Sequence, residues 1–126
     1  MAAERTAPPA LIAVSEHGRR LASHVRGQLI PGQPRAALER AWQDGRDVVF
    51  FGAAGIAVRL LAPLLSDKMR DPAVVVVDDA GRHAISLLSG HEGGANRLAT
   101  EVAAQLGAEP VVSTAREVLG LSLIHI

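Results

Sequence analysis

The residues Ser86-Leu87-Leu88-Ser89-Gly90-His91-Glu92-Gly93-Gly94-Ala95-Asn96 join an apolar run to a helix through three glycines and a histidine. The helix is indicated by apolar residues that recur with the spacing of one helix face. These residues are Leu98, Ala99, Val102, Ala103 and Leu106, and Gly107 follows as a left-handed C-cap. Backbone N–H groups at the start of such a helix point forward and favour anions. We therefore expect an anion-binding bend at residues 89–94.

The glycines of this bend allow two interpretations. Gly90, Gly93 and Gly94 lack a Cβ atom, so a ligand can approach the main chain and the backbone can take positive φ. Equally, they can serve only a tight strand-to-helix connection, and the spacing does not separate these alternatives. The order G-H-E-G-G matches neither the dinucleotide fingerprint nor the phosphate-binding loop that ends in G-K-[ST]. Nucleotide binding is therefore disfavoured.

Length and composition narrow the class of protein. The chain has 126 residues, enough for one domain, and its net charge is zero, so no overall field attracts nucleic acid or an anionic membrane. Aromatic residues make up 2% of the chain, too few for base-stacking platforms, and the absence of cysteine excludes disulfides and thiolate chemistry. No apolar run approaches the roughly 18 residues of a membrane span. We expect a cytoplasmic protein without nucleic-acid or membrane partners.

The chain divides into three parts. We expect a disordered lead-in at residues 1–9, one α/β domain at 10–120, and a non-native tail at 121–126, whose sequence L-S-L-I-H-I resembles a translated sequencing adapter. The domain begins with an apolar strand at 10–14. A helix follows from Ser15, a suitable N-cap, to about Leu29, and a second helix covers residues 35–44.

A second glycine bend follows the run V-V-F-F, which ends at Phe51 and is typical of a strand buried on both faces. The bend is Gly52-Ala53-Ala54-Gly55, and residues 56–65 beyond it are apolar on almost every side, which predicts burial. Arg59 is the exception: it can be a snorkelling side chain, but a buried guanidinium must meet a carboxylate or a ligand anion. Pro63 should end the helix. The charged run at 66–72 favours a solvent-exposed connecting loop.

The next segments predict a β-hairpin and complete the fold. Strands at 73–77 and 82–88 flank the turn Asp78-Asp79-Ala80-Gly81, and a last strand is expected at 110–113. The order β-α-α-β-α-β-β-α-β indicates an α/β fold, a Rossmann-like layered sheet with flanking helices and one hairpin at about 73–88. Ligands on such sheets lie beyond the carboxyl ends of strands. We therefore expect the bends at 52–59 and 89–96 to face one cleft.

Four motifs in this order resemble the amino-terminal domain of the cobalamin biosynthesis family CbiG. They are G-A-A-G-I-A-V-R at 52–59, A-P-L-L-S-D-K at 62–68, D-P-A-V-V-V-V-D at 71–78 and S-L-L-S-G-H-E-G-G-A-N at 86–96. The resemblance runs without gaps from about residue 48 to 115. It implies a cobalt-precorrin-5A hydrolase of the anaerobic vitamin B12 route, which opens a ring-A lactone and releases acetaldehyde.

The resemblance also implies a cobalt-bearing tetrapyrrole as substrate, with many carboxylates for cationic side chains to pair. The implied catalytic residues are His91, as base for water, and Asn96, as donor or orienting group. Neither a cofactor nor a protein metal site is implied, because cobalt arrives with the substrate. The implied substrate-binding residues are Gly52, Gly55, Arg59, Lys68, Ser89, Gly90, Gly93 and Gly94.

Alternatives remain for single residues and for the whole chain. His91 can cap or hydrogen-bond the backbone without touching substrate, and Glu92 can complement the helix dipole. Asp67 can pair with Lys68 or Arg59, or act on substrate. Family members usually continue into a carboxy-terminal domain, which we expect as a partner of this region. The alternative function is a non-catalytic tetrapyrrole-binding or scaffold domain of a larger cobalamin-pathway protein.

Overall fold

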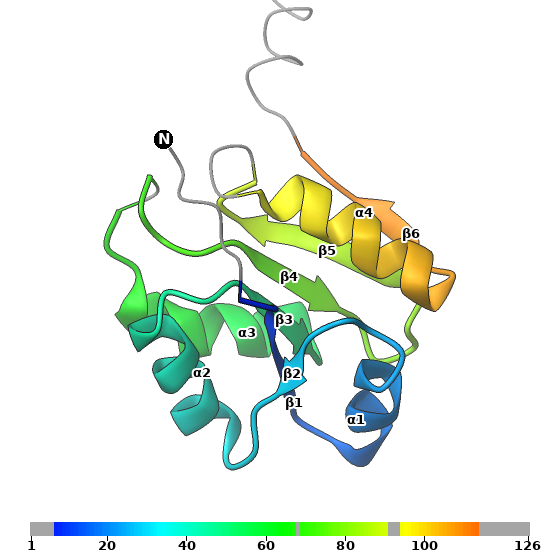
Figure 1. The fold of residues 1–126 in the computed structure, drawn as a ribbon, viewed down its shortest axis with the longest axis horizontal. Helices are drawn as coiled ribbons and strands as arrows, with labels where there is room; N and C mark the ends of the chain where they lie inside the picture. The colour runs from blue at the N-terminus through cyan, green and yellow to red at the C-terminus, as the bar shows by residue number, and fades with distance from the viewer. Residues whose placement is uncertain (1–6, 68, 91–93, 114–126) are drawn as a thin grey trace, which may run out of the picture.

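The computed structural model describes residues 7–67, 69–90 and 94–113, which form one sheet with helices on both faces (Figure 1). The six strands are β1 (Ala10–Ala13), β2 (Gln28–Leu29), β3 (Val48–Phe51), β4 (Val74–Val77), β5 (His83–Leu88) and β6 (Glu109–Val111). The helices are α1 (Glu16–Ala22), α2 (Pro34–Gln43), α3 (Ala54–Leu61), the short 3-10 helix η1 (Ala62–Leu64) and α4 (Ala95–Leu106). The α/β fold predicted from the sequence is confirmed.

The strand order is β2-β1-β3-β4-β5-β6. All neighbours pair in parallel except β4 and β5, which pair antiparallel and form the predicted hairpin. Strand β3 lies in the middle, and all four of its residues are buried, as its continuous apolar run predicts for a strand covered on both faces. The hairpin reverses the direction of β5 and, with it, that of β6 relative to the rest of the sheet.

Two apolar layers separate the helices from the sheet. Helices α2 and α3 pack on one face, against a cluster that includes Ile12, Phe50 and Val76, and we call this the α2/α3 face. Helices α1 and α4 pack on the opposite face, against a cluster that includes Phe51 and Val77. Alternate residues of each central strand enter opposite layers, because side chains along a strand point in turn to either side.

Residues that the sequence predicted as helix caps or helix breakers lie at the ends of several helices. The hydroxyl of Ser15 accepts the N–H of Gly18 at 3.0 Å and caps α1, as predicted. Gly107 takes the left-handed conformation, with φ of 68°, and ends α4. Pro63 lies in η1, where the α-helical pattern of α3 has stopped.

The first helix is shorter than predicted, because the chain pairs as a strand before residue 29. Helix α1 ends at Ala22, and the N–H of Gln28 donates to the carbonyl of Pro9 at 2.9 Å. A Cβ atom on Gly27 would lie 2.7 Å from that same carbonyl oxygen, so the close approach of the two backbones depends on glycine. Backbone groups that a longer helix would have hydrogen-bonded internally therefore pair in the sheet instead.

The last residues of the segment 1–9, which was expected to be a disordered lead-in, contact the rest of the domain. The guanidinium of Arg46 donates to the carbonyl of Pro8, at 2.6 Å from Nη2, and Pro9 is buried beside β1. Residues 1–6 and the tail at 121–126 lie outside the described residues.

Candidate functional site

The structure separates the two glycine bends instead of bringing them to one cleft. Gly52 follows β3 at the end of the sheet where Phe51 pairs with Val77, which we call the carboxyl end. Strand β5 runs the other way, so its last residue, Leu88, pairs with Val74, the first residue of β4. The Ser89 bend thus lies at the opposite end, which we call the amino end. The expectation of a shared cleft is wrong because the hairpin reverses β5.

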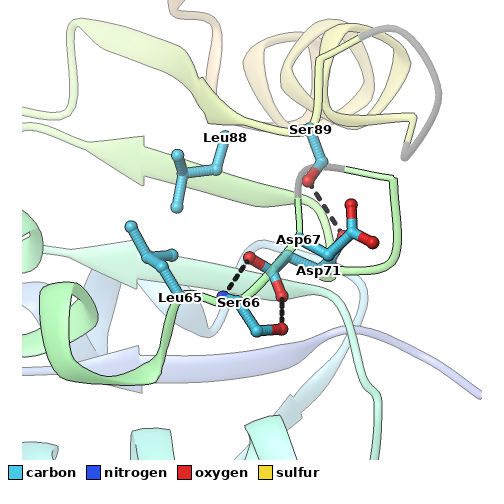
Figure 2. A pocket seen from close by; sticks show the side chains of 6 residues that line it. All are labelled: Leu65, Ser66, Asp67, Asp71, Leu88 and Ser89. Carbon is cyan, nitrogen blue, oxygen red and sulfur yellow. Dashed lines mark hydrogen bonds between the residues drawn. The ribbon is translucent and has the colours of Figure 1, made fainter.

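The amino-end bend begins with a residue in an unusual backbone conformation. Ser89 has φ of 59°, and it is the one non-glycine residue with positive φ in the described ranges 7–67, 69–90 and 94–113. Its hydroxyl donates to the backbone carbonyl of Asp71 at 2.9 Å (Figure 2). Positive φ in a residue with a side chain is strained and persists where surrounding contacts hold it. The hydrogen bond to Asp71 is such a contact.

The start of α4 uses its first amides within the bend. The N–H of Ala95 donates to the carbonyl of Ser89 at 3.0 Å, and the N–H of Asn96 donates to the carbonyl of Gly90 at 3.0 Å. These two donors are therefore not available to an anion, and the sequence argument from the helix N-terminus is wrong for them. Gly94 precedes the helix with φ of 87°, a conformation that favours glycine.

Gly90, Asn96 and Ser86 form a compact polar cluster at the root of the bend. The hydroxyl of Ser86 donates to Oδ1 of Asn96 at 2.6 Å, from strand β5 to helix α4. A Cβ atom on Gly90 would lie 2.8 Å from that Oδ1 atom and 3.3 Å from the Ser86 hydroxyl oxygen. Packing therefore explains the glycine at position 90. The side-chain nitrogen of Asn96, Nδ2, has no partner among the described residues.

A hollow of about 220 Å³ opens beside this bend. Its lining is Leu65, Ser66, Asp67, Asp71, Leu88 and Ser89, and Figure 2 shows the side chains of Leu65 and Leu88 facing each other. Ligand sites for whole small molecules are typically about 300–1,000 Å³. This hollow can therefore hold only part of a tetrapyrrole.

The loop between η1 and β4 is fixed by the carboxylate of Asp71, which is 8% exposed. One carboxylate oxygen accepts the N–H of Ser66 at 3.0 Å, and the other accepts the Ser66 hydroxyl at 3.1 Å. Burying a carboxylate is costly unless it is hydrogen-bonded, and Ser66 supplies both bonds. The sequence predicted a solvent-exposed loop at residues 66–72, but the carboxylate of Asp71 is buried and holds the loop through Ser66.

Neither Arg59 nor Arg70 lines the hollow, and Lys68 lies outside the described residues. Arg59 is exposed in the last turn of α3, which excludes its interpretation as a buried guanidinium. The burial predicted for residues 56–65 is also wrong at Ile56 and Val58, which are 46% and 50% exposed. Arg70 lies 3.9 Å from Asp67, in an exposed ion pair. The hollow itself carries the carboxyl groups of Asp67 and Asp71, which repel anions, so its apolar walls suit a ring edge or methyl group better than an acetate side chain.

The two glycines at the carboxyl end of the sheet differ from each other. A Cβ atom on Gly52 would lie 2.9 Å from Val14 Cγ2 and 3.1 Å from Phe50 Cε2, so packing explains this glycine. A Cβ atom on Gly55 would meet no atom within 4 Å. Gly55 therefore has no structural need for glycine in the described part of the chain.

The carboxyl end also holds a well-bonded acidic group at the hairpin turn. Oδ1 of Asp78 accepts the N–H groups of Arg82 at 2.9 Å and His83 at 2.8 Å. Partial burial raises the pKa of this carboxyl, but the hydrogen bonds from His83 and Arg82 outweigh it. The pKa lies below its ordinary value of 3.8. The group shapes the turn and is not part of the Ser89 bend.

Three predicted site residues, Lys68, His91 and Gly93, lie outside the described residues. Sequence reasoning missed Ser66, Asp71 and Ser86. For Ser86 there was a signal, since a serine at an inward position of an alternating strand needs a polar partner. No local sequence pattern indicated the hydrogen bonds between Ser66 and Asp71. In the described ranges no helix has the length and apolar character needed to cross a membrane.

Comparisons with known proteins agree on one family. The family described as cobalamin synthesis G N-terminal matches residues 36–117. The cobalt-precorrin-5A hydrolase of Salmonella typhimurium is 58% identical over 77 residues, which make up 61% of this chain and 22% of that protein. The cobalt-precorrin-5A hydrolase of Priestia megaterium is 47% identical over 91 residues, 72% of this chain and 24% of that protein.

A solved structure supports the same assignment. The crystal structure of a protein assigned as a cobalamin biosynthesis protein G homolog, from Sulfolobus solfataricus, superimposes with a TM-score of 0.71 at 28% identity. The match covers 84% of this chain and 36% of that one. The aligned regions span 22% and 24% of the two curated relatives' lengths. Because the family match covers more than half of its residues, the chain belongs to the cobalamin synthesis G N-terminal family.

Proposed function

We propose that this chain is the amino-terminal part of a cobalt-precorrin-5A hydrolase and that its Ser89 bend contributes to the substrate site. The family match at residues 36–117 spans the bend, and the strained Ser89 is the observation that carries the assignment to this end of the sheet. The reaction opens the ring-A lactone of a cobalt-bearing tetrapyrrole and releases acetaldehyde. Cobalt enters with the substrate, and no resident cofactor is proposed.

The chemistry needs a base and a fixed geometry. Water adds to the lactone carbonyl carbon and the ring C–O bond breaks, which leaves a carboxyl and a hydroxyl group. For acetaldehyde to leave, the C–C bond between the macrocycle and the hydroxyl-bearing carbon must then break: that carbon becomes the aldehyde carbonyl, and the electron pair and a proton pass to the macrocycle. His91 is the proposed base, since an imidazole of ordinary pKa accepts a proton near neutral pH. The structure describes the residue before it, Gly90, whose carbonyl accepts the N–H of Asn96. This contact, together with the Ser89 hydrogen bond, would hold the base in place.

Asn96 is proposed as a positioning residue. Its Oδ1 atom accepts the Ser86 hydroxyl at 2.6 Å and lies against Gly90, so the side chain braces the root of the bend. Asn96 does not line the hollow. Its side-chain N–H groups have no partner among the described residues, and its bond to Ser86 fits an orienting role better than donation to the lactone oxyanion.

Only one end of the sheet can hold the reacting ring. The four residues of β3 put about 13 Å of packed sheet between the two bends, so a macrocycle cannot contact both through the core. We assign the ring to the amino end, with Arg59, Lys68 and Arg70 as candidate partners for its carboxylates. Each charge-assisted bond is worth about 1.5–3 kcal/mol. Gly55, at the other end, is not part of this proposal.

A non-catalytic binding module is the second candidate. The observation that favours it is that Asn96, one of the two predicted catalytic residues, is already engaged by Ser86. In that case the catalytic groups would come from the rest of the polypeptide. A cytoplasmic location stays a prediction.

A hybrid enzyme tests the proposal. In the Salmonella relative, the 77 aligned residues are replaced by those of this chain, and acetaldehyde release from cobalt-precorrin-5A is measured. The hybrid should be active, and His91→Ala should lower release by about 100-fold or more while substrate binding changes little. Unchanged release in His91→Ala would favour the binding module, and an inactive hybrid that binds no corrinoid would exclude both.

A further inference from the structure

One half of the α2/α3 face has no helix over it in the described part of the chain. The main contacts of α2 and α3 with the sheet are with β1 and β4, whereas α4 packs on β4, β5 and β6 from the other side. Strand register places Ile85 on the α2/α3 face opposite Val76, and Val111 beside Ile85. Val111 is 41% exposed, and Ile85 is partly buried. The sheet is thus covered on one side only at β5 and β6.

The flank of α3 that borders this uncovered area is also apolar. Ala57 and Leu61 face the sheet, and Val58 follows about 80° further around the helix, at 100° per residue. Crossovers between parallel strands are right-handed, and in the β3-α3-β4 unit this turns the Val58 flank toward β5. Val58 is 50% exposed. Leu65, 45% exposed, continues the surface toward Leu88, as Figure 2 shows.

We propose that this surface, the open apolar face, is the docking site for an aliphatic helix from the rest of the same full-length polypeptide. It is made of Val58, Leu65, Ile85, Leu87, Leu88 and Val111. Large contiguous apolar surfaces on soluble proteins mark interaction sites, and a helix is the usual cover for an apolar sheet face. The inference rests on the proposed membership of a longer enzyme, but not on any catalytic role.

The occupant is argued from the relatives and from continuity of the chain. The aligned regions are only 22% and 24% of the curated relatives, and the family is the amino-terminal part of those proteins, so most of their polypeptide follows this region. Strand β6 borders the open apolar face, and consecutive elements are usually neighbours in space. The polypeptide that follows β6 in the relatives therefore starts beside the surface that needs a cover.

Docking there would also complete the hollow at the amino end. Leu65 and Leu88 belong both to the open apolar face and to the hollow. A helix on this face would supply another wall for the hollow, which is too small by itself for a tetrapyrrole. The substrate site would then lie between this region and the rest of the enzyme.

The test uses the 126-residue chain and, as a separate protein, the part of the Salmonella relative that follows the aligned region. Binding is measured by isothermal titration calorimetry, without substrate. Val58→Asp and Val111→Asp should each weaken binding at least about 10-fold, because each buries an unpaired carboxylate. Ile56→Asp is the matched control, since Ile56 is 46% exposed on the opposite flank of the same helix, and its affinity should stay within about 2-fold.

Circular dichroism checks that the three variants keep the fold, which their exposure predicts. Three results would each overturn the proposal: no binding by the unsubstituted chain, equal binding by Val58→Asp, or a loss with Ile56→Asp as large as with Val58→Asp. Self-association of the chain that Val58→Asp abolishes would identify a second copy as the occupant and would also overturn it. Because no corrinoid is present, these outcomes are independent of the hydrolase assay.

Discussion

The hydroxyl of Ser89 donates a 2.9 Å hydrogen bond to the backbone carbonyl of Asp71, and this contact joins the end of β5 to the loop that precedes β4. Ser89 holds φ of 59° in making it. The same loop is fixed by the Asp71 carboxylate through Ser66. The bend at the amino end is therefore held by hydrogen bonds from two neighbouring segments of the chain.

Substitution of Ser89 should separate the hydrogen bond from the backbone strain. Ser89→Ala and Ser89→Gly both lose the bond to Asp71, but only alanine keeps a Cβ atom in the left-handed conformation. The glycine variant should therefore be about 1 kcal/mol more stable than the alanine variant in urea unfolding. Equal stability of the two would show that residue 89 is not strained.

Gly90 and Gly55 should respond oppositely to alanine. Gly90→Ala brings Cβ to 2.8 Å from Asn96 Oδ1 and should cost about 1–3 kcal/mol in the free energy of unfolding. Gly55→Ala meets nothing within 4 Å and adds a better helix former, so it should be neutral or stabilising by up to about 1 kcal/mol. Denaturant titrations of both variants make the comparison. A tolerated Gly90→Ala would contradict the packed cluster with Ser86.

The Asp71 carboxylate should be a stability determinant because it is buried and bonded twice by Ser66. Asp71→Ala should cost about 1.5–3 kcal/mol, and Asp79→Ala, at an exposed acid, should change stability by less than about 0.5 kcal/mol. A double-mutant cycle with Ser66→Ala should give a coupling energy of at least about 0.5 kcal/mol. Additive effects would mean that the Asp71–Ser66 bonds contribute nothing.

Asp78 should give an acid-dependent contribution to stability. Its folded pKa lies below the ordinary 3.8, so the folded state favours the carboxylate. The contribution is complete above the unfolded pKa and is lost as pH falls through the folded pKa. The stability difference between the parent chain and Asp78→Asn should be constant at neutral pH and shrink below about pH 4. A difference that grows on acidification would contradict the direction of the shift.

The sequence predicted elements better than their directions in space. The run ending at Phe51, the Ser15 cap and the helix ended by Gly107 each follow from local chemistry, and each was confirmed. The hairpin was predicted too, but its consequence is tertiary. Because β5 runs opposite to β3, Gly52 and Ser89 lie at opposite ends of the sheet, although both follow strands.

The candidate site was predictable only where polarity broke a pattern. Ser86 interrupts the inward apolar positions of its strand, and its partner Asn96 was singled out from the sequence. The apolar run around Val58 and Arg59 predicted burial, but both residues are exposed. Hydropathy alone does not show which part of a protein covers an apolar surface. No local rule brings Ser66 to Asp71, because that bond depends on the course of the loop after η1.

Hydrogen–deuterium exchange of the hybrid Salmonella enzyme, with and without cobalt-precorrin-5A, tests the location of the site most directly. The account predicts that substrate slows exchange in peptides covering residues 65–71 and 86–96, at the amino end of the sheet. Peptides that cover residues 52–55, at the carboxyl end, should not change. Protection confined to the carboxyl-end peptides would contradict the assignment of the Ser89 bend to the substrate site.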